Sequence, residues 1–137
     1  MDADECRRRF AAADHAYLAT TGDDGQPHLV PVVVVLAGDE IFFAVDHKPK
    51  RTTALRRLRN IAENPRVSFL VDHYEADWTR LWWVRADADA RVVLGGEEHA
   101  RVVAALQERH PPYARLAPTG PVVVAGVQRW SGWTAAL

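Results

Sequence analysis

The alternation of apolar and polar positions predicts a protein made mostly of β-strands. Residues 15–21 change side at every step, with Ala16 and Leu18 on one side and Tyr17 and Ala19 on the other. This alternation is typical of a strand with two different faces. Further strands are expected at residues 27–36, 40–45, 66–71, 81–94 and 122–130, with residues 81–94 forming either one bent strand or a strand pair.

Turn-forming residues indicate how the first strands connect. Residues 22–25 read Gly-Asp-Asp-Gly, and residues 38–39 are a Gly-Asp pair of the kind that closes a two-residue hairpin. Because short hairpins join neighbouring antiparallel strands, the first three strands are expected to form an antiparallel meander.

Three segments carry a helical pattern. Leu55, Leu58 and Ala62 fall on one face of residues 52–63, and the Asn-Pro pair at 64–65 ends that helix. Helices are also expected at residues 4–13 and 97–109, and an irregular loop at residues 111–121. The fold class is therefore mainly β: an antiparallel β-barrel with short helices at its ends, in a single domain over residues 1–137.

Pro31 lies inside the second expected strand. Proline has no N–H to donate to a ladder, so it marks an edge strand or a bulge. A group other than a neighbouring strand is therefore expected to face this backbone.

Positive charge is concentrated just before and within the helix at residues 52–63. Both lysines of the chain, Lys48 and Lys50, lie in residues 47–53, and Arg56, Arg57 and Arg59 follow in the helix. The N-terminus of a helix already carries positive partial charge, so cations there are unfavourable unless an anion lies between them and the helix N–H groups. The pattern predicts a phosphate or carboxylate site; a solvated basic turn is the alternative.

Overall charge and cysteine content exclude several function classes. The net charge is −1 and there is one cysteine, Cys6. A balanced charge disfavours nucleic acid as a partner, and a lone cysteine excludes an internal disulfide and fits a cytoplasmic location. The longest apolar run, residues 29–37, is far shorter than the ~20 residues that span a bilayer, so no membrane partner is expected.

Common catalytic and metal motifs are missing. The six histidines show no metal-ligand spacing, so no metal site is expected. Ser68 and Ser131 lack a nucleophile-elbow context, and Gly95-Gly96 is not part of a dinucleotide-binding fingerprint. Cys6 is interpreted as a bystander.

Five tryptophans in 137 residues are unusual. Trp82 and Trp83 are adjacent in a predicted strand and so point to opposite faces. One is expected in the core, and the other at a subunit interface or cofactor pocket. Arg80 and Arg85 nearby are either solvated or part of an anion site.

Two segments carry a family resemblance. Residues 59–67 (Arg-Asn-Ile-Ala-Glu-Asn-Pro-Arg-Val) and 77–85 (Asp-Trp-Thr-Arg-Leu-Trp-Trp-Val-Arg), placed after the Pro31 strand and the basic loop, resemble the pyridoxamine 5′-phosphate oxidase-like family. This is a family of antiparallel split β-barrel proteins related to FMN-binding protein. The chain is most similar to the actinobacterial branch thought to use the deazaflavin coenzyme F-420.

The resemblance implies a homodimer with the cofactor at the subunit interface. Its ring would lie against the strand that holds Pro31, Val32 and Val33, and Trp78 would reach it from the partner subunit. The basic loop and the following helix would hold the cofactor's phosphate, through Lys48, Lys50, Arg51, Thr52, Arg56 and Arg57.

The resemblance also implies a function: an oxidoreductase that transfers a hydride between coenzyme F-420 and a small organic substrate. FMN is the alternative cofactor, and a non-catalytic carrier of a flavin, deazaflavin or haem is the alternative function. The motif for pyridoxal phosphate is not evident, so vitamin B6 oxidation is not expected. His73, Tyr74 and water are all open as the proton source.

Overall fold

The computed structural model describes residues 1–45 and 52–135, and of residues 52–55 the backbone alone. The elements, in chain order, are α1 (Ala3–Ala11), β1 (His15–Thr21), β2 (Pro27–Val33), β3 (Val35–Ala37), β4 (Glu40–Ala44), α2 (Thr52–Glu63), β5 (Arg66–His73), the 3₁₀ turn η1 (Trp78–Arg80), β6 (Trp82–Val93), α3 (Gly96–Arg109), α4 (Pro111–Arg115) and β7 (Val122–Thr134).

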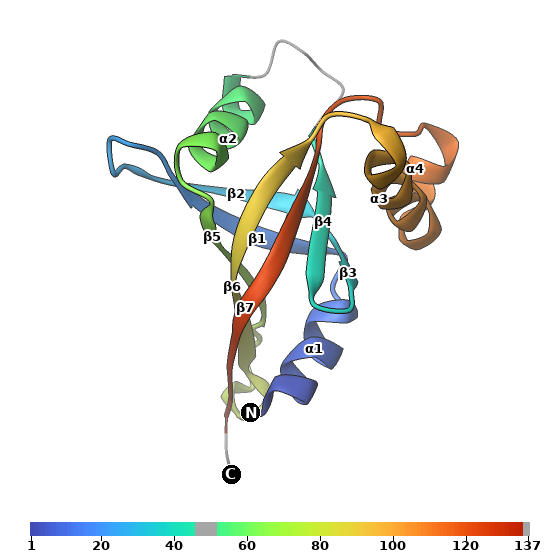
Figure 1. The fold of residues 1–137 in the computed structure, drawn as a ribbon. Coiled ribbons are helices and arrows are strands. Elements are labelled where there is room, and N and C mark those ends of the chain that lie inside the picture. Colours follow the sequence, from blue (N-terminus) through green and yellow to red (C-terminus); the bar gives the residue numbers. More distant parts are fainter. Residues whose placement is uncertain (46–51, 136–137) are drawn as a thin grey trace.

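The described strands form a seven-stranded sheet with the order β2-β1-β5-β6-β7-β4-β3, in which all pairs are antiparallel. The sheet curls so that its two edges approach each other, as a half-barrel (Figure 1). This confirms the prediction of a mainly β, antiparallel split barrel with short helices.

The predicted meander is wrong. Residues 27–37 do not form one strand: the chain bends at Val34, so that β2 lies at one edge of the sheet and β3 at the other. Val34 is buried, and its carbonyl accepts a hydrogen bond from Nε2 of His110 at 2.7 Å. The unbroken β-branched run gave no sign of this bend, because the partner that fixes it lies far along the chain.

The inner face of the curled sheet holds the main hydrophobic core. Phe69 of β5 packs between Phe10 of α1 and Phe43 of β4, with ring centroids 6.4 and 6.1 Å away. The three rings are essentially inaccessible to solvent. Burial of apolar surface of this kind is the dominant stabilising term in folding.

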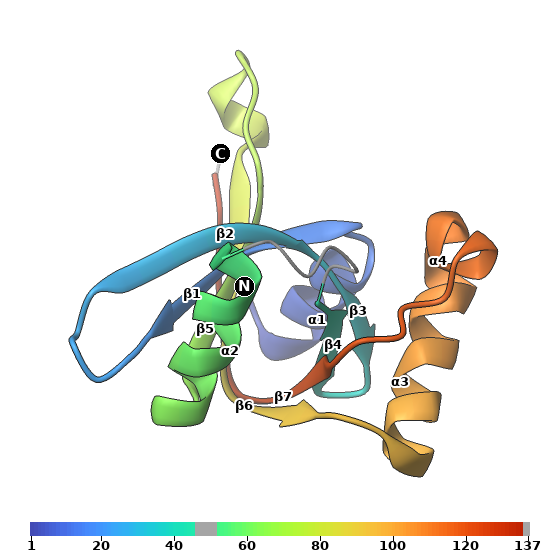
Figure 2. The ribbon, with the colours of Figure 1, turned by 90° about the horizontal axis from the view of Figure 1, so that it is seen from above.

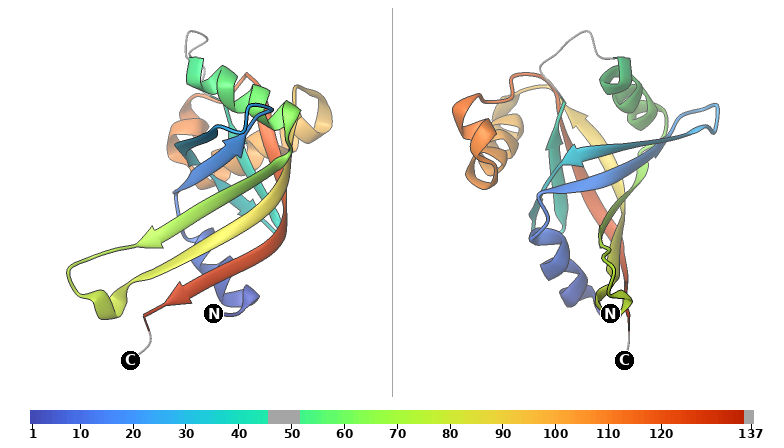
Figure 3. Two further views of the ribbon diagram at one scale, coloured as in Figure 1. Left: turned by 90° about the vertical axis from the view of Figure 1, so that its left-hand side faces the viewer. Right: turned by 180° about the vertical axis from the view of Figure 1, so that it is seen from behind.

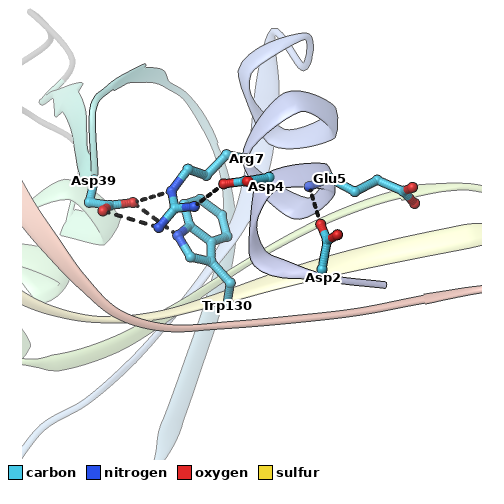
Figure 4. A network of polar contacts seen from close by, with 6 residues as sticks. All are labelled: Asp2, Asp4, Glu5, Arg7, Asp39 and Trp130. Carbon is cyan, nitrogen blue, oxygen red and sulfur yellow. Dashed lines mark hydrogen bonds and ion pairs between the residues drawn. The ribbon is translucent and has the colours of Figure 1, made fainter.

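Helix α1 closes one end of this core. Its buried side chains are Cys6 and Phe10, and its outer side is fixed by Arg7, whose guanidinium contacts Asp39 in the β3–β4 turn at 2.7 Å. Asp39 also accepts a hydrogen bond from the indole of Trp130 at 3.0 Å (Figure 4). Polar contacts therefore hold the helix at the rim while apolar contacts hold it at the centre.

A second, smaller core lies on the other side of β4 and β7. Val102 and Leu106 of α3 pack there against Phe42 and Val124. The predicted irregular loop at residues 111–121 contains a short helix, α4, instead, and this prediction is wrong. The fixed φ angle of proline favours the first turn of a helix, so the two prolines at the start of α4 begin it rather than prevent it.

Helix α2 spans the predicted residues and lies across the β1–β2 end of the barrel (Figures 1 and 2). Asn60 is buried, and its side-chain amide donates to Oγ1 of Thr20 at 3.1 Å. A Cβ atom at Gly22 would lie 2.6 Å from Oε1 of Glu63 and 2.7 Å from Oδ1 of Asn60. The helix can approach the β1–β2 turn this closely because residue 22 is glycine.

The ends of β5, β6 and β7 extend beyond the barrel as an arm, with η1 at its tip (Figures 2 and 3). Residues 81–94, predicted as either one bent strand or a strand pair, contain one long strand, β6, which begins after Leu81. Strand β7 continues past Trp130, where the predicted strand ended, because residues 131–134 pair with residues 82–85. Among the described residues, no helix combines the length and apolar character needed to cross a bilayer.

Candidate functional site

A groove of about 640 Å³ lies on the outer face of the sheet, over β1, β2, β5 and β6. Because side chains alternate along a strand, the residues next to the core residues point outward here. The groove is mostly apolar, with Tyr17, Leu29, Leu70 and Trp83 among the residues that line it, and Asp72 and Arg85 supply charge. Its size is within the range of small-molecule sites.

The apolar side chains of this face are uncovered. Leu29 is 68% exposed, Tyr17 39% and Leu70 37%. Pro31 and Val33 extend the same surface along the edge strand β2, where they lie opposite Tyr17 and His15 in the ladder. Contiguous exposed apolar surface of this kind marks an interaction or ligand site.

The predicted ring-contact stretch divides between two faces. Pro31 and Val33 face outward, whereas Val32 is only 8% exposed and packs in the core. A period of two makes this unavoidable in a strand. Only the first and third residues of the stretch have side chains on the outer face.

Positive charge lies where α2 meets β2. Arg56 forms an ion pair with Asp24 of the β1–β2 turn at 3.0 Å, and Arg57 is half-buried beside it in the helix. Burial lowers the pKa of His28 on β2, and the positive charges of Arg57 and Arg56 lower it further. Two guanidinium groups lie beside a neutral imidazole, so positive charge exceeds negative charge in this region.

Two buried nitrogen atoms in this region, Nδ1 of His28 and Nε of Arg56, have no hydrogen-bond partner among the described residues. Buried polar groups are almost always paired, with protein, water or ligand. The donors and positive charge present here therefore fit an anionic group such as a phosphate.

The structure does not bring all the predicted site residues together. Trp78 is the first residue of η1 and is 76% exposed. The arm that carries η1 extends away from the end of the barrel where α2 lies (Figure 1). Lys48, Lys50 and Arg51 lie outside the described residues, and Thr52 is described only as the first residue of α2. One protomer thus presents Pro31, Val33, Arg56 and Arg57 near the β2 edge, and Trp78 far from them.

The tip of the arm is held by a short polar network. Oδ1 of Asp77 accepts hydrogen bonds from the backbone N–H and the hydroxyl of Thr79, at 3.0 and 2.6 Å. Glu75 contacts His73 and lies 3.1 Å from Nε of Arg80. Contacts with His73 and Arg80, in that order, lower the pKa of Glu75. Trp78 is therefore presented on an ordered turn.

Trp82 and Trp83 point to opposite faces, as predicted. Trp82 packs against the core, with the guanidinium of Arg9 4.9 Å from its ring centre, and Trp83 lines the outer groove. Arg85, left open by the sequence, lies 5.9 Å from the ring of Trp83 and 3.3 Å from Asp87. Arg85 thus lines the groove, with 43% of its side chain still exposed.

Sequence reasoning missed an aspartate–histidine pair at the start of β1. Nδ1 of His15 lies 2.7 Å from Oδ1 of Asp14, and the imidazole contacts the ring of Tyr17 edge-on at 5.8 Å. The strand pattern at residues 15–21 placed His15 and Tyr17 on one side, but it did not show that this side is the groove. His73, an earlier candidate for the proton source, points to the inward side of β5 instead.

The thiol of Cys6 is unsuited to chemistry at the site. Cys6 is buried in the core, and burial raises the pKa of its thiol, which makes it a poor nucleophile. Among residues 1–45 and 52–135, no group of three or more His, Cys, Asp or Glu side chains is placed to hold a metal ion.

Several solved structures share this fold. A conserved hypothetical protein from Mycobacterium tuberculosis is 26% identical, with a TM-score of 0.74 over 98% of this chain and 86% of that one. A FAD-binding protein from Mesorhizobium loti (19% identity, TM-score 0.74, 96% and 92% covered) and the haem storage protein of Vibrio cholerae (19%, 0.73, 96% and 93%) are similar in fold.

Sequence comparison gives the family directly. No curated protein sequence matches the chain. Residues 3–134, however, match the sequence profile described as pyridoxamine 5′-phosphate oxidase. With the curled antiparallel sheet and the neighbours above, this shows that the chain belongs to the pyridoxamine 5′-phosphate oxidase family.

Proposed function

We propose that the protein is an oxidoreductase that binds the deazaflavin coenzyme F-420 and transfers a hydride between it and a small organic substrate. The proposal rests on one observation above all. Positive charge and unpaired buried nitrogens lie at the α2–β2 junction on one side of the edge strand β2, and the uncovered apolar side chains of β1 and β2 lie on the other side of the same strand. This pairing suits a ligand with a flat ring at one end and a phosphate at the other.

Different side chains would bind the phosphate and the ring of the coenzyme. Arg56 and Arg57, with Lys48, Lys50, Arg51 and Thr52 before them, would hold the phosphate, and the outward side chains of Pro31 and Val33 would contact the ring. Guanidinium groups hold phosphate well because their donors match its oxygen atoms. When bound, the coenzyme supplies the hydride chemistry, and the protein binds, orients and excludes water.

A homodimer completes this arrangement. The outer face is apolar and uncovered in one protomer, and the arm carries exposed Trp78 away from it. A second copy of the chain packed on this face would bury Leu29 and Leu70 and bring its own Trp78 toward the ring. The site would then be shared between two subunits.

The excess of basic residues favours coenzyme F-420 over FMN, because its oligoglutamate tail adds negative charge beyond the phosphate. The FAD-binding neighbour from Mesorhizobium loti supports flavin binding as the alternative within this fold. Parallel fluorescence titrations of the protein with coenzyme F-420 and with FMN discriminate the two, and tighter binding of FMN would overturn the preference.

The double variant Lys50→Ala/Arg57→Ala tests the phosphate site. Each charge-assisted hydrogen bond lost is expected to cost about 1.5–3 kcal/mol, so the loss of two should raise the Kd for the coenzyme by at least about 100-fold. Arg8→Ala/Arg115→Ala removes the same charge from two exposed positions on other helices and should leave the Kd near that of the wild type. Equal affinities for both double variants would contradict this placement.

A non-catalytic carrier is the second candidate, supported by the similarity to the haem storage protein of Vibrio cholerae. Stopped-flow oxidation of bound, reduced coenzyme F-420 by unsaturated acceptors separates the two functions. If no acceptor speeds oxidation beyond the rate in solution while haemin binds tightly in an absorbance titration, the carrier function holds and the enzyme function fails.

A further inference from the structure

The Asp14–His15 pair is built so that one particular nitrogen of the imidazole exchanges a proton. An ionised carboxylate only accepts hydrogen bonds, so Nδ1 of His15 must carry the hydrogen in the 2.7 Å contact with Asp14. The hydrogen bond from His15 lowers the pKa of Asp14, and the charge of Arg109 contributes to this. Nε2 is therefore the ring nitrogen that this contact does not use.

The ladder between β1 and β2 fixes where this imidazole lies. His15 is opposite Val33 and Tyr17 is opposite Pro31, and all four side chains are on the outer face. Directly opposed residues in an antiparallel pair have Cβ atoms about 4.5–5.5 Å apart. A ring lying across Pro31 and Val33 would thus have His15 along its flank.

An opening beside the pair leads to solvent. The β1–β5 ladder covers only Tyr17–Ala19, and before it lies a cavity of about 280 Å³ lined by Asp14 and His15 on one side and Asp72 and His73 on the other. The titratable and charged groups that face His15 are Asp14 and Tyr17 nearby, Asp72 and His73 across the opening, and Arg9 of α1. Of these, His73 is held by Glu75. Water in this opening can return a proton to His15.

We propose that His15 is the proton donor of the reaction, that Asp14 is its positioning residue, and that the substrate is an α,β-unsaturated carbonyl compound. The proposal rests on the proposed function. The substrate takes a hydride from the reduced coenzyme at its β-carbon, which forms a C–H bond, and the π electrons move to the carbonyl oxygen.

The second half of the reaction is the proton transfer. The Nε2–H bond of the imidazolium breaks, and its proton passes to the enolate. The substrate has then gained a hydride and a proton, which together are two electrons and two protons, and the coenzyme has lost the hydride and so has been oxidised by two electrons. His15 is left neutral, with Nδ1–H still directed at Asp14. This chemistry needs a protic group next to the ring, and among the described groups His15 lies there with a fixed tautomer.

The first test needs no coenzyme. Long-range ¹H–¹⁵N correlation spectra of ¹⁵N-histidine-labelled protein report which nitrogen of each neutral imidazole carries the hydrogen. His15 should be protonated at Nδ1 in the wild type, and should shift toward the Nε2–H form in Asp14→Asn. A wild-type His15 in the Nε2–H form, or a spectrum unchanged by Asp14→Asn, would overturn the role of Asp14.

The second test follows the oxidation of bound, reduced coenzyme F-420 by 2-cyclohexenone in a stopped-flow instrument. His15→Gln should slow this step about 10²-fold, the lower end of what general acid catalysis contributes, without changing the Kd for the coenzyme. Asp14→Asn should slow it about tenfold. His99→Gln is the control, since His99 lies on α3 and contacts the carbonyl oxygen of Gly120 away from the groove, and it should behave as wild type.

The outcomes separate this proposal from the function on which it rests. A wild-type rate in His15→Gln, or an equal loss in His99→Gln, contradicts the assignment of His15 while leaving coenzyme binding intact. A wild-type protein that binds neither coenzyme F-420 nor FMN contradicts the proposed function, and this proposal with it.

Discussion

The two faces of the sheet carry similar apolar side chains, but the inner face buries them and the outer face leaves them exposed. Phe69 and Leu70 are neighbours in β5: Phe69 is 0% exposed between two other rings, whereas Leu70 is 37% exposed on the floor of the outer groove. Helix α1 and the curl of the sheet cover the inner face (Figure 3). Within the described chain, the outer surface around Leu70 has no such cover.

This difference in exposure indicates that the two faces have different roles. A sheet that served only stability would place polar residues on its open side, as one-sided antiparallel sheets do. Tyr17, Leu29 and Leu70 on the open side gain nothing for the lone protomer. They are explained if a ring and a second subunit cover them, and the following predictions test this contrast.

The largest effect is expected from Phe69→Ala on the inner face. Removal of a ring packed among Phe10, Phe43 and the core should lower the free energy of unfolding by about 3–5 kcal/mol, because a cavity remains where the ring was. Urea denaturation followed by circular dichroism measures this. A loss below about 1 kcal/mol would show that the inner face is not the principal core.

A smaller and different effect is expected from Leu70→Glu on the outer face. The variant should keep its circular dichroism spectrum but weaken self-association by roughly 30-fold or more, the effect of about 2 kcal/mol at a buried interface position. Sedimentation equilibrium measures the association. Leu116→Glu, at an exposed leucine after α4, is the control and should associate as wild type. Unchanged association in both variants would remove the outer face as the interface.

The smallest effect is expected at the rim, from Asp39→Asn. Hydrogen bonds from Arg7 and Trp130 lower the pKa of Asp39 below its ordinary value of 3.8 (Figure 4). The stability this gives is complete above pH about 4 and is lost as the pH falls through the lowered pKa. Because Asp39 is exposed, the gain is at most about 1 kcal/mol.

The measurement for Asp39→Asn is the difference in unfolding free energy between variant and wild type at pH 6 and at pH 3. The difference should be present at pH 6 and shrink at pH 3, where the wild-type carboxylate takes up a proton. A difference that grows as the pH falls would mean that the ionised carboxylate does not hold α1 at the rim.

Local signals in the sequence sufficed for several elements. Alternation located β1, and the Asn-Pro pair at 64–65 gave the end of α2, because each depends on neighbouring residues alone. The bend at Val34 depends on His110, 76 positions away, so no local pattern contains it. Similarly, the sequence shows only that Asp14 and His15 lie between a predicted helix and a predicted strand. The β1–β2 ladder is needed to show which residues lie opposite His15.

The sequence predicted a candidate site without its arrangement. The excess of arginine on α2 predicts an anion site, but the sequence did not show that Arg56 pairs with Asp24 or that His28 lies half-buried beside it. Nor does a run of valines reveal which members face the groove. Only the pairing with β1 shows that Val32 is inside and Val33 outside.

The strand order also governs how the chain reaches this structure during synthesis. The last strand in the chain, β7, lies between β6 and β4. Until it leaves the ribosome, the strands already made form two separate ladders, β2-β1-β5-β6 and β4-β3, joined through the backbone at Val34 but by no pairing. The barrel therefore closes only after residues 122–134 have been made, and a product truncated before Val122 would expose two open edges to chaperones and proteases.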